Sequence, residues 1–187
     1  SKFIQPSSKK ELTIATGVKD GEYYKTALIY KDLLERQKVK VNLITSNGSI
    51  DNIKLLNDKK ADMAFVQNGI HQLKSQTNLK AIASIYYEPL WLFYKKQDYT
   101  IDYIIQLITK KIAIGNVGSG TRDLAEKILN DNGIDNKNSN LISYSSNEAK
   151  DLLLKGEIDA MFMVGSPNSE IVKELLEDSN INLFSFK

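Results

Sequence analysis

An internal repeat constrains the fold of this chain more than any other feature of its sequence. The segment LTIATGVKDGEYYKTAL, from Leu12, matches KIAIGNVGSGTRDLAEKIL, from Lys111, in plan: an apolar strand, a glycine-rich loop and a helix. Later in each half, NIKLLNDKKADMAFVQNG from Asn52 parallels EAKDLLLKGEIDAMFMVGS from Glu148. Each half therefore has the pattern β-α-β-α-β, which predicts a parallel sheet with helices on both faces.

Two such halves predict an α/β protein of two lobes, each a small sheet flanked by helices. We expect a polar tail over residues 1–10, a first lobe over 11–87 and a second lobe over 88–187, with a hinge near 84–92. Because open α/β sheets bind ligands at the carboxyl ends of their strands, we expect a ligand cleft between the lobes.

The apolar spacing also predicts individual elements. A helix from about Glu22 is expected to bury one face. A short helix carrying His71 and a further helix over residues 101–108 are expected later, and the apolar stretch 81–94, interrupted by Pro89, is expected to be a strand passing between the lobes. The residues expected on the buried face of the first helix are Tyr24, Leu28, Tyr30, Leu33 and Leu34.

Composition excludes several classes of protein. With 25 basic and 23 acidic residues, the net charge of +2 gives no electrostatic argument for a nucleic-acid partner. The chain has no cysteine, which excludes disulfides and thiol catalysis. No apolar run is long enough to predict a membrane-spanning helix. The opening SKFIQPSSKK is typical of a polar tether left after removal of an export signal, or of a trimmed chain.

The loop from Gly115 to Gly120 has a chemistry that suits an oxyanion. Ser119 and Thr121 precede a helical pattern, and Arg122 follows at once. The first amides of a helix have no partners within the helix and lie at the positive end of its dipole, so a carboxylate or phosphate fits there. The alternative is that the hydroxyls only cap the helix and the glycines only make the turn.

The candidate ligand-binding residues are those that end a strand or begin a helix at this predicted edge, together with aromatic residues for a pocket wall. For Ser49, plain helix capping is the alternative. At least one of Tyr23 and Tyr24 is expected in the core, since neighbours on a helix cannot face the same way. The candidates are Thr16, Gly17, Gly21, Tyr23, Ser46, Ser49, Gln67, Trp91, Gly118, Ser119, Gly120, Thr121, Arg122, Gly165 and Ser166.

The sequence gives no argument for an enzyme, a cofactor or a metal. The glycine loop lacks the Gly-Lys-Ser/Thr of a phosphate-binding loop and does not have dinucleotide spacing. The single histidine, His71, lies in the other half from Ser119, and the Gly-x-Ser-x-Gly pattern of a nucleophile is absent. No carboxylate pair has a spacing that indicates glycoside chemistry or a metal site.

Five short motifs resemble one family in their order and spacing. They are Thr16-Gly17 with Gly21 and Tyr23-Tyr24, Gly48-Ser49 with Asn52, Ala61 to Gln67, Glu88 to Tyr94, and Gly118 to Arg122. From about Leu12 to its end, the chain resembles the TAXI-type solute-binding proteins of TRAP transporters, which have the type II periplasmic binding protein fold. The resemblance implies a periplasmic or extracytoplasmic receptor, free or membrane-tethered, that presents a small glutamate-like or dicarboxylate-like anion to membrane permease subunits.

Two alternatives stay open beside this resemblance. Family members are longer and return to the first lobe, whereas this chain stops at Lys187, so we expect the return segment to be missing. The first alternative is therefore that this region is the ligand-sensing domain of a membrane-anchored receptor. The other alternative is a phosphate- or sulfate-binding protein, because Ser119 to Asp123 resembles the oxyanion loop of phosphate-binding relatives. Tyr23 and Trp91 favour an organic ligand, which can use apolar area.

Overall fold

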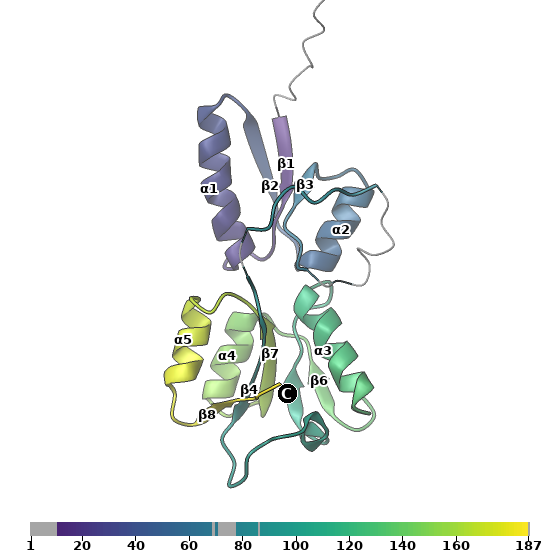
Figure 1. Ribbon diagram of the computed structural model, residues 1–187, viewed down its shortest axis with the longest axis vertical. Coiled ribbons are helices and arrows are strands. Elements are labelled where there is room, and N and C mark those ends of the chain that lie inside the picture. The colour runs from purple at the N-terminus through teal and green to yellow at the C-terminus, as the bar shows by residue number, and fades with distance from the viewer. Residues whose placement is uncertain (1–10, 69, 71–77, 86, 187) are drawn as a thin grey trace, which may run out of the picture. The chain divides into compact units, whose positions relative to one another are not determined.

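The computed structural model describes residues 11–68, 70, 78–85 and 87–186, which form two compact units, Ser1–Asn68 and Gly69–Lys187. Each unit has its own sheet with helices packed against it (Figure 1), so the predicted α/β architecture of two flanked sheets is confirmed. The expected polar tail and the short helix around His71 lie outside the described residues. The units divide after Asn68, ahead of the predicted lobe boundary at 87–88.

Unit 1 is a three-stranded parallel sheet with two helices. The strand order is β2-β1-β3, α1 packs against β2, and α2 packs against β1 and β3. This arrangement follows from the β-α-β-α-β pattern, because crossovers between parallel strands are right-handed. The elements are β1 (Glu11–Ala15), α1 (Glu22–Arg36), β2 (Lys40–Ile44), α2 (Ser49–Asn57) and β3 (Met63–Ala64).

The expected buried face of α1 is wrong at three positions. Only Ala27 of this helix is fully buried, and the side chains of Leu28, Tyr30 and Leu33 are exposed by 45%, 40% and 50%. A sheet of three strands offers α1 only a narrow surface. The helix therefore packs on the sheet through Ala27, and the residues on either side of this contact stay exposed. Apolar spacing identifies the residues that can be buried but does not show how wide a surface covers them.

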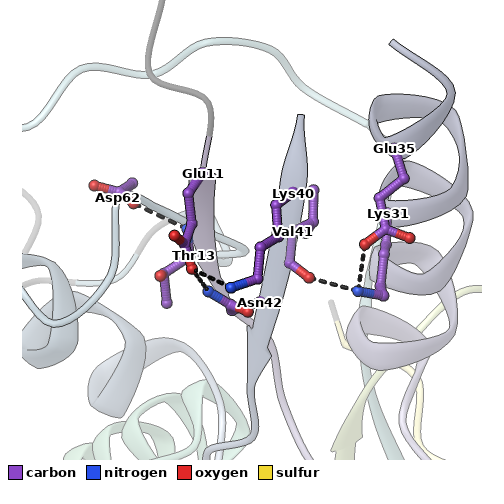
Figure 2. A network of polar contacts seen from close by, with 8 residues as sticks. All are labelled: Glu11, Thr13, Lys31, Glu35, Lys40, Val41, Asn42 and Asp62. Atoms are coloured by element: carbon purple, nitrogen blue, oxygen red, sulfur yellow. Dashed lines mark hydrogen bonds and ion pairs between the residues drawn. The ribbon is translucent and has the colours of Figure 1, made fainter. Parts of the chain in front are cut away.

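Polar contacts link the amino ends of the strands in unit 1 (Figure 2). The Glu11 carboxylate on β1 accepts hydrogen bonds from Lys40 Nζ (3.0 Å) and Asn42 Nδ2 (2.6 Å) on β2. Lys31 of α1 donates to the backbone oxygen of Val41 at 2.5 Å. Exposed contacts of this kind contribute little energy each, but they favour one register of β1 on β2 and cover part of an edge strand.

Unit 2 is built around a mixed five-stranded sheet of order β6-β5-β7-β4-β8. Strands β5, β6 and β7 are parallel, as the repeat predicts, whereas β4 is antiparallel to β7 and β8. The elements are β4 (Leu90–Lys95), the 3-10 turn η2 (Ile104–Leu107), β5 (Lys111–Ala113), α3 (Gly120–Asp131), β6 (Asn140–Ile142), α4 (Ser146–Leu154), β7 (Ala160–Val164), α5 (Glu170–Glu177) and β8 (Ile181–Leu183).

Two predicted elements in unit 2 are corrected. The strand expected over 81–94 begins only at Leu90, where pairing with Val164 starts, and residues 81–85 are exposed and irregular. An extended apolar run needs a partner strand to hold it, and none is present before Leu90 in the described residues. The helix expected over 101–108 is the short turn η2, where the Gln106 side chain accepts from the N–H groups of Asp102 and Tyr103.

Side chains of unit 2 alternate between two cores, one on each face of the sheet. Leu92 and Phe162 belong to the cluster that packs on α3, and Phe93 and Met161 belong to the cluster that packs on α4 and α5. Successive residues of a strand point to opposite faces, so a strand covered on both sides buries every residue. The near-continuous apolar sequence of β4 and β7 is explained by this two-sided burial.

The helices α4 and α5 are joined by one partly buried ion pair. Lys150 of α4, whose side chain is 17% exposed, lies 2.5 Å from the Glu174 carboxylate of α5 and 3.3 Å from Asp151. Hydrogen bonding to Glu174 raises the pKa of Lys150, against the opposing effect of burial. The pair therefore stabilises the packing of α5 while Lys150 carries its charge.

We expect Leu129→Ala to lower the free energy of unfolding by about 2–5 kcal/mol, because Leu129 is fully buried between α3 and the sheet. The matched control is Leu176→Ala on α5, where the side chain is 52% exposed and the loss should stay near about 0.5 kcal/mol. Urea denaturation followed by circular dichroism measures both variants. Equal losses in the two variants would contradict the assigned core.

A second prediction concerns pH. A raised pKa means that the Lys150 contribution to stability is present below the ordinary lysine value of 10.5 and is lost as pH rises through the folded-state pKa. Lys150→Met should therefore be less stable than the wild type at neutral pH, and the difference should shrink above about pH 10.5. Lys127→Met, which breaks an exposed pair with Asp131, is the control. A stability difference for Lys150→Met that is constant across this range would refute the assignment.

Candidate functional site

The carboxyl ends of the three strands of unit 1 bring together the candidate residues of the first half. Thr16 and Gly17 follow β1, Ser46 follows β2, and Gln67 lies just beyond β3. Because the strands are parallel, these loops lie at one edge of the sheet. Thr16 is fully buried, and its hydroxyl donates to the Ile44 backbone oxygen at 3.0 Å.

The serine hydroxyls at this edge make hydrogen bonds within the protein. Ser46 Oγ accepts from the Gly48 N–H at 3.0 Å, and its single proton has two acceptors within reach, Asn52 Oδ1 at 2.7 Å and the Thr16 backbone oxygen at 3.1 Å. Ser49 Oγ accepts from the Gln67 N–H at 2.9 Å. Ser49 is thus the first residue of α2 rather than its cap, a position held by Gly48, which has φ of 127°. These hydroxyls shape the loops that would contact a ligand.

Asn52 connects all three loops, and the candidate set did not contain it. Its side chain is fully buried on α2, its Nδ2 donates to the backbone oxygens of Thr16 and Phe65, and its Oδ1 accepts from Ser46 Oγ. The sequence carries a signal for this role, since a polar residue stands directly before the buried Ile53 on a helix that packs on the sheet.

Two glycines, Gly17 and Gly21, precede α1, and the ring of Tyr23 at the start of this helix makes an aromatic contact. The ring of Tyr23 stacks on Phe65, with centroids 5.6 Å apart and an angle of 21°. A Cβ at Gly17 would lie 3.6 Å from Tyr23, which is an ordinary van der Waals contact, so the packing of the tyrosine on the loop does not require glycine. Gly21 is the N-cap of α1 and gives it no side-chain cap. Tyr23 and Tyr24 are both partly buried, and Tyr23 is the one that borders this edge.

The loop of unit 2 is a tight turn capped by its own serine. Gly115 has φ of +89°, and a Cβ there would lie 2.9 Å from Ser119 Oγ, so only glycine fits without strain. Ser119 Oγ donates to the Asn116 backbone oxygen (2.7 Å) and accepts from the Arg122 N–H (3.1 Å). Thr121 Oγ1 accepts from the Val164 N–H at 3.1 Å. The Ser119 hydroxyl oxygen therefore caps α3, and the Thr121 hydroxyl oxygen links α3 to β7.

Backbone donors remain at the start of α3. Within the described part of the chain, the N–H groups of Gly120 and Thr121 have no hydrogen-bond acceptor, and the Thr121 hydroxyl hydrogen is also left over. Arg122 Nε donates to Glu126 at 2.7 Å, and its side chain is 22% exposed. Two open amides at a helix N-terminus can donate hydrogen bonds to an anionic group, and the Arg122 guanidinium is held by Glu126 on the same helix.

The antiparallel strand β4 brings Trp91 to the same edge of unit 2. Its residue Leu90 pairs with Val164, so the start of β4 lies beside the carboxyl end of β7. Trp91 Nε1 donates to the Gly165 backbone oxygen at 2.9 Å. Next to it, Ser166 Oγ accepts from a loop N–H at 3.2 Å. The candidates of the second half, including Gly118 in the loop before α3, thus lie around the ends of β5 and β7.

Among the described residues, no three side chains of histidine, aspartate or glutamate lie close enough together to hold a metal ion. In the same part of the chain, no helix has both the length and the apolar character needed to cross a membrane.

The fold is similar to that of solved solute-binding proteins. It resembles an ancestral arginine-binding protein bound to arginine (TM-score 0.66, 18% identity, 94% of this chain and 79% of that one). It also resembles the periplasmic aliphatic sulphonate binding protein SsuA from Escherichia coli (TM-score 0.56, 16% identity, 94% of this chain and 56% of that one). By sequence, the chain belongs to the NMT1-like family, which matches residues 14–187. No curated protein matches it.

We expect Thr121→Val to lower the free energy of unfolding by about 1–3 kcal/mol, because the Val164 N–H loses its acceptor in a part-buried place. Thr121→Ser keeps the hydroxyl and should stay close to wild type, which makes it the matched control. Chemical denaturation of both variants measures the difference. If the valine variant is as stable as the serine variant, the hydrogen bond to Val164 contributes nothing.

Proposed function

We propose that this protein is an extracytoplasmic solute-binding receptor that captures a small organic anion, glutamate-like or dicarboxylate-like. The family and the fold support a binding protein rather than an enzyme. The observation that carries the anionic part of the proposal is the start of α3, where the amides of Gly120 and Thr121 are open beside Arg122. A carboxylate there would receive charge-assisted hydrogen bonds.

The proposed contacts follow from the geometry of the loops. Backbone N–H groups at the start of α3 and the Thr121 hydroxyl hydrogen would bind one carboxylate, because the Ser119 hydroxyl is occupied as a cap. Arg122 would turn from Glu126 to the ligand or share its charge between the two. Taken by itself, the carboxyl edge of the unit 1 sheet offers backbone groups on the loops held by Asn52 and the apolar surface of Tyr23.

We further propose that the receptor delivers its ligand to the membrane permease of a TRAP-type transporter. This rests on the five motifs that resemble TAXI-type receptors. Ligand sensing by a membrane-anchored protein is the alternative, and the same binding site would serve it. Among the similar folds, arginine and sulphonate are bound by different proteins, so the fold alone does not select a ligand.

Isothermal calorimetry with a panel of compounds tests the proposed ligand class. The panel contains L-glutamate, succinate, 2-oxoglutarate, L-arginine, ethanesulfonate and inorganic phosphate. Trp91, the single tryptophan, contacts Gly165 and should report binding by a change in fluorescence. We expect the carboxylates to bind. Binding of phosphate alone would replace the organic anion with the inorganic alternative, and binding of none would overturn the proposal.

We expect Arg122→Gln to weaken binding of the dicarboxylate by about tenfold or more, since a charged hydrogen bond contributes about 1.5–3 kcal/mol. The chain has one other arginine, Arg36, which also pairs with a carboxylate at i,i+4 spacing, through Asp32 at 2.6 Å. Arg36→Gln is therefore the matched control and should bind like wild type. If both variants keep wild-type affinity, Arg122 does not contact the ligand.

A further inference from the structure

The polar side chains at the carboxyl edge of the unit 1 sheet form one network centred on Asn52. The Asn52 amide donates to backbone oxygens on two loops, those of Thr16 after β1 and Phe65 after β3. Its oxygen accepts from Ser46 Oγ, 2.7 Å away on the third loop, after β2. Ser46 Oγ also accepts from the Gly48 N–H, and the Thr16 backbone oxygen, 3.1 Å away, is the alternative acceptor for its single proton.

Both N–H donors of the Asn52 amide and its oxygen have hydrogen-bond partners. The side chain is fully buried, with two donors and one acceptor satisfied, and none of its partners is charged. A buried amide that lost a partner would leave a polar group without water, which costs about 1–3 kcal/mol. The three loops are therefore coupled through one side chain, and a change in any of them requires a change at Asn52.

We propose that Asn52 is the positioning residue of the ligand-binding edge of unit 1: it holds the loops after β1, β2 and β3 in the conformation that receives a ligand. The ligand part of this inference rests on the function proposed above. Asn52 would not touch the ligand, because it is buried beneath the loops. It would act through the Thr16–Gly17 backbone, the Ser46–Gly48 turn and Gln67.

Amide hydrogen exchange tests this role without a ligand. Asn52→Asp keeps the shape of the side chain and removes both N–H donors. At neutral pH, the N–H groups of Ser46, Gly48 and Gln67, which are hydrogen-bonded in these loops, should exchange about tenfold faster or more. Amides within β1 and β2 should keep the wild-type rate. Asn57→Asp, at the exposed end of the same helix, is the control and should change none of them.

Uniform acceleration throughout unit 1 would mean that Asn52 only stabilises the fold, and unchanged loop amides would mean that it does not hold the loops. Either result overturns the inference. Ser46→Ala removes the hydroxyl, with its bonds to Asn52 and to the Gly48 N–H, but leaves both N–H bonds of Asn52 in place, and it serves as the second variant. It should accelerate the same loop amides by a smaller factor, even if the Asn52 variant unfolds.

Lowering the pH distinguishes a loss of hydrogen-bond donors at residue 52 from a general loss of packing. Once protonated, the introduced carboxyl of Asn52→Asp regains one donor. The exchange rates of the loop amides should then differ less from those of wild type measured at the same pH. The charged groups on α2 and on the strands that pack against it, including the residue before β3, are Asp51, Lys54, Glu11 and Asp62. These groups are also present in Asn57→Asp, which should show no such pH dependence.

Titration with succinate and L-glutamate separates this inference from the proposed function. If wild type binds either compound, Asn52→Asp should bind it about tenfold more weakly or worse, and Asn57→Asp should bind it normally. Wild-type affinity in Asn52→Asp would overturn the positioning role. If wild type binds neither compound, the proposed ligand class fails, while the exchange rates still decide whether Asn52 holds the loops.

Discussion

Strand β7 has to bury both of its faces, and the rest of unit 2 depends on that requirement. Its residues Ala160 to Met163 are all buried, and they alternate between two apolar clusters. One face needs α3 and the other needs α4 and α5, so the β-α-β-α-β chain has to place helices on both sides. Once that packing is satisfied, the loops after β5 and β7 lie at one edge of the sheet.

The loops at the two sheet edges are held by different kinds of hydrogen bond. In unit 2, serines cap the helices, as Ser119 does for α3, and Thr121 joins α3 to β7. In unit 1, both helices begin after glycines without side-chain caps, and a buried side chain, Asn52, holds the loops instead. The serines and threonines at both edges have structural hydrogen bonds, so backbone groups are the main donors left for an anion.

Much of the fold could be predicted from local pattern. The repeat predicted two parallel β-α-β-α-β units, and both sheets have the same order, in which the first strand lies between the second and third. The start of α3 was also predictable, because Gly115 needs a positive φ and Ser119 is a strong N-cap. The exposure of Leu28 and Leu33 was not predictable, since it depends on the width of the sheet against which α1 packs.

By itself the sequence determined most of the strands and helices and the glycine turns, because period-two and period-3.6 patterns and turn residues act over a few positions. Tertiary structure alone decided that β4 runs antiparallel, which brings Trp91 to Gly165, residues 74 apart in the chain. It also decided that Asn52 lies beneath three loops. Contacts between distant segments depend on strand direction and on which helix face is covered, and no local pattern records either.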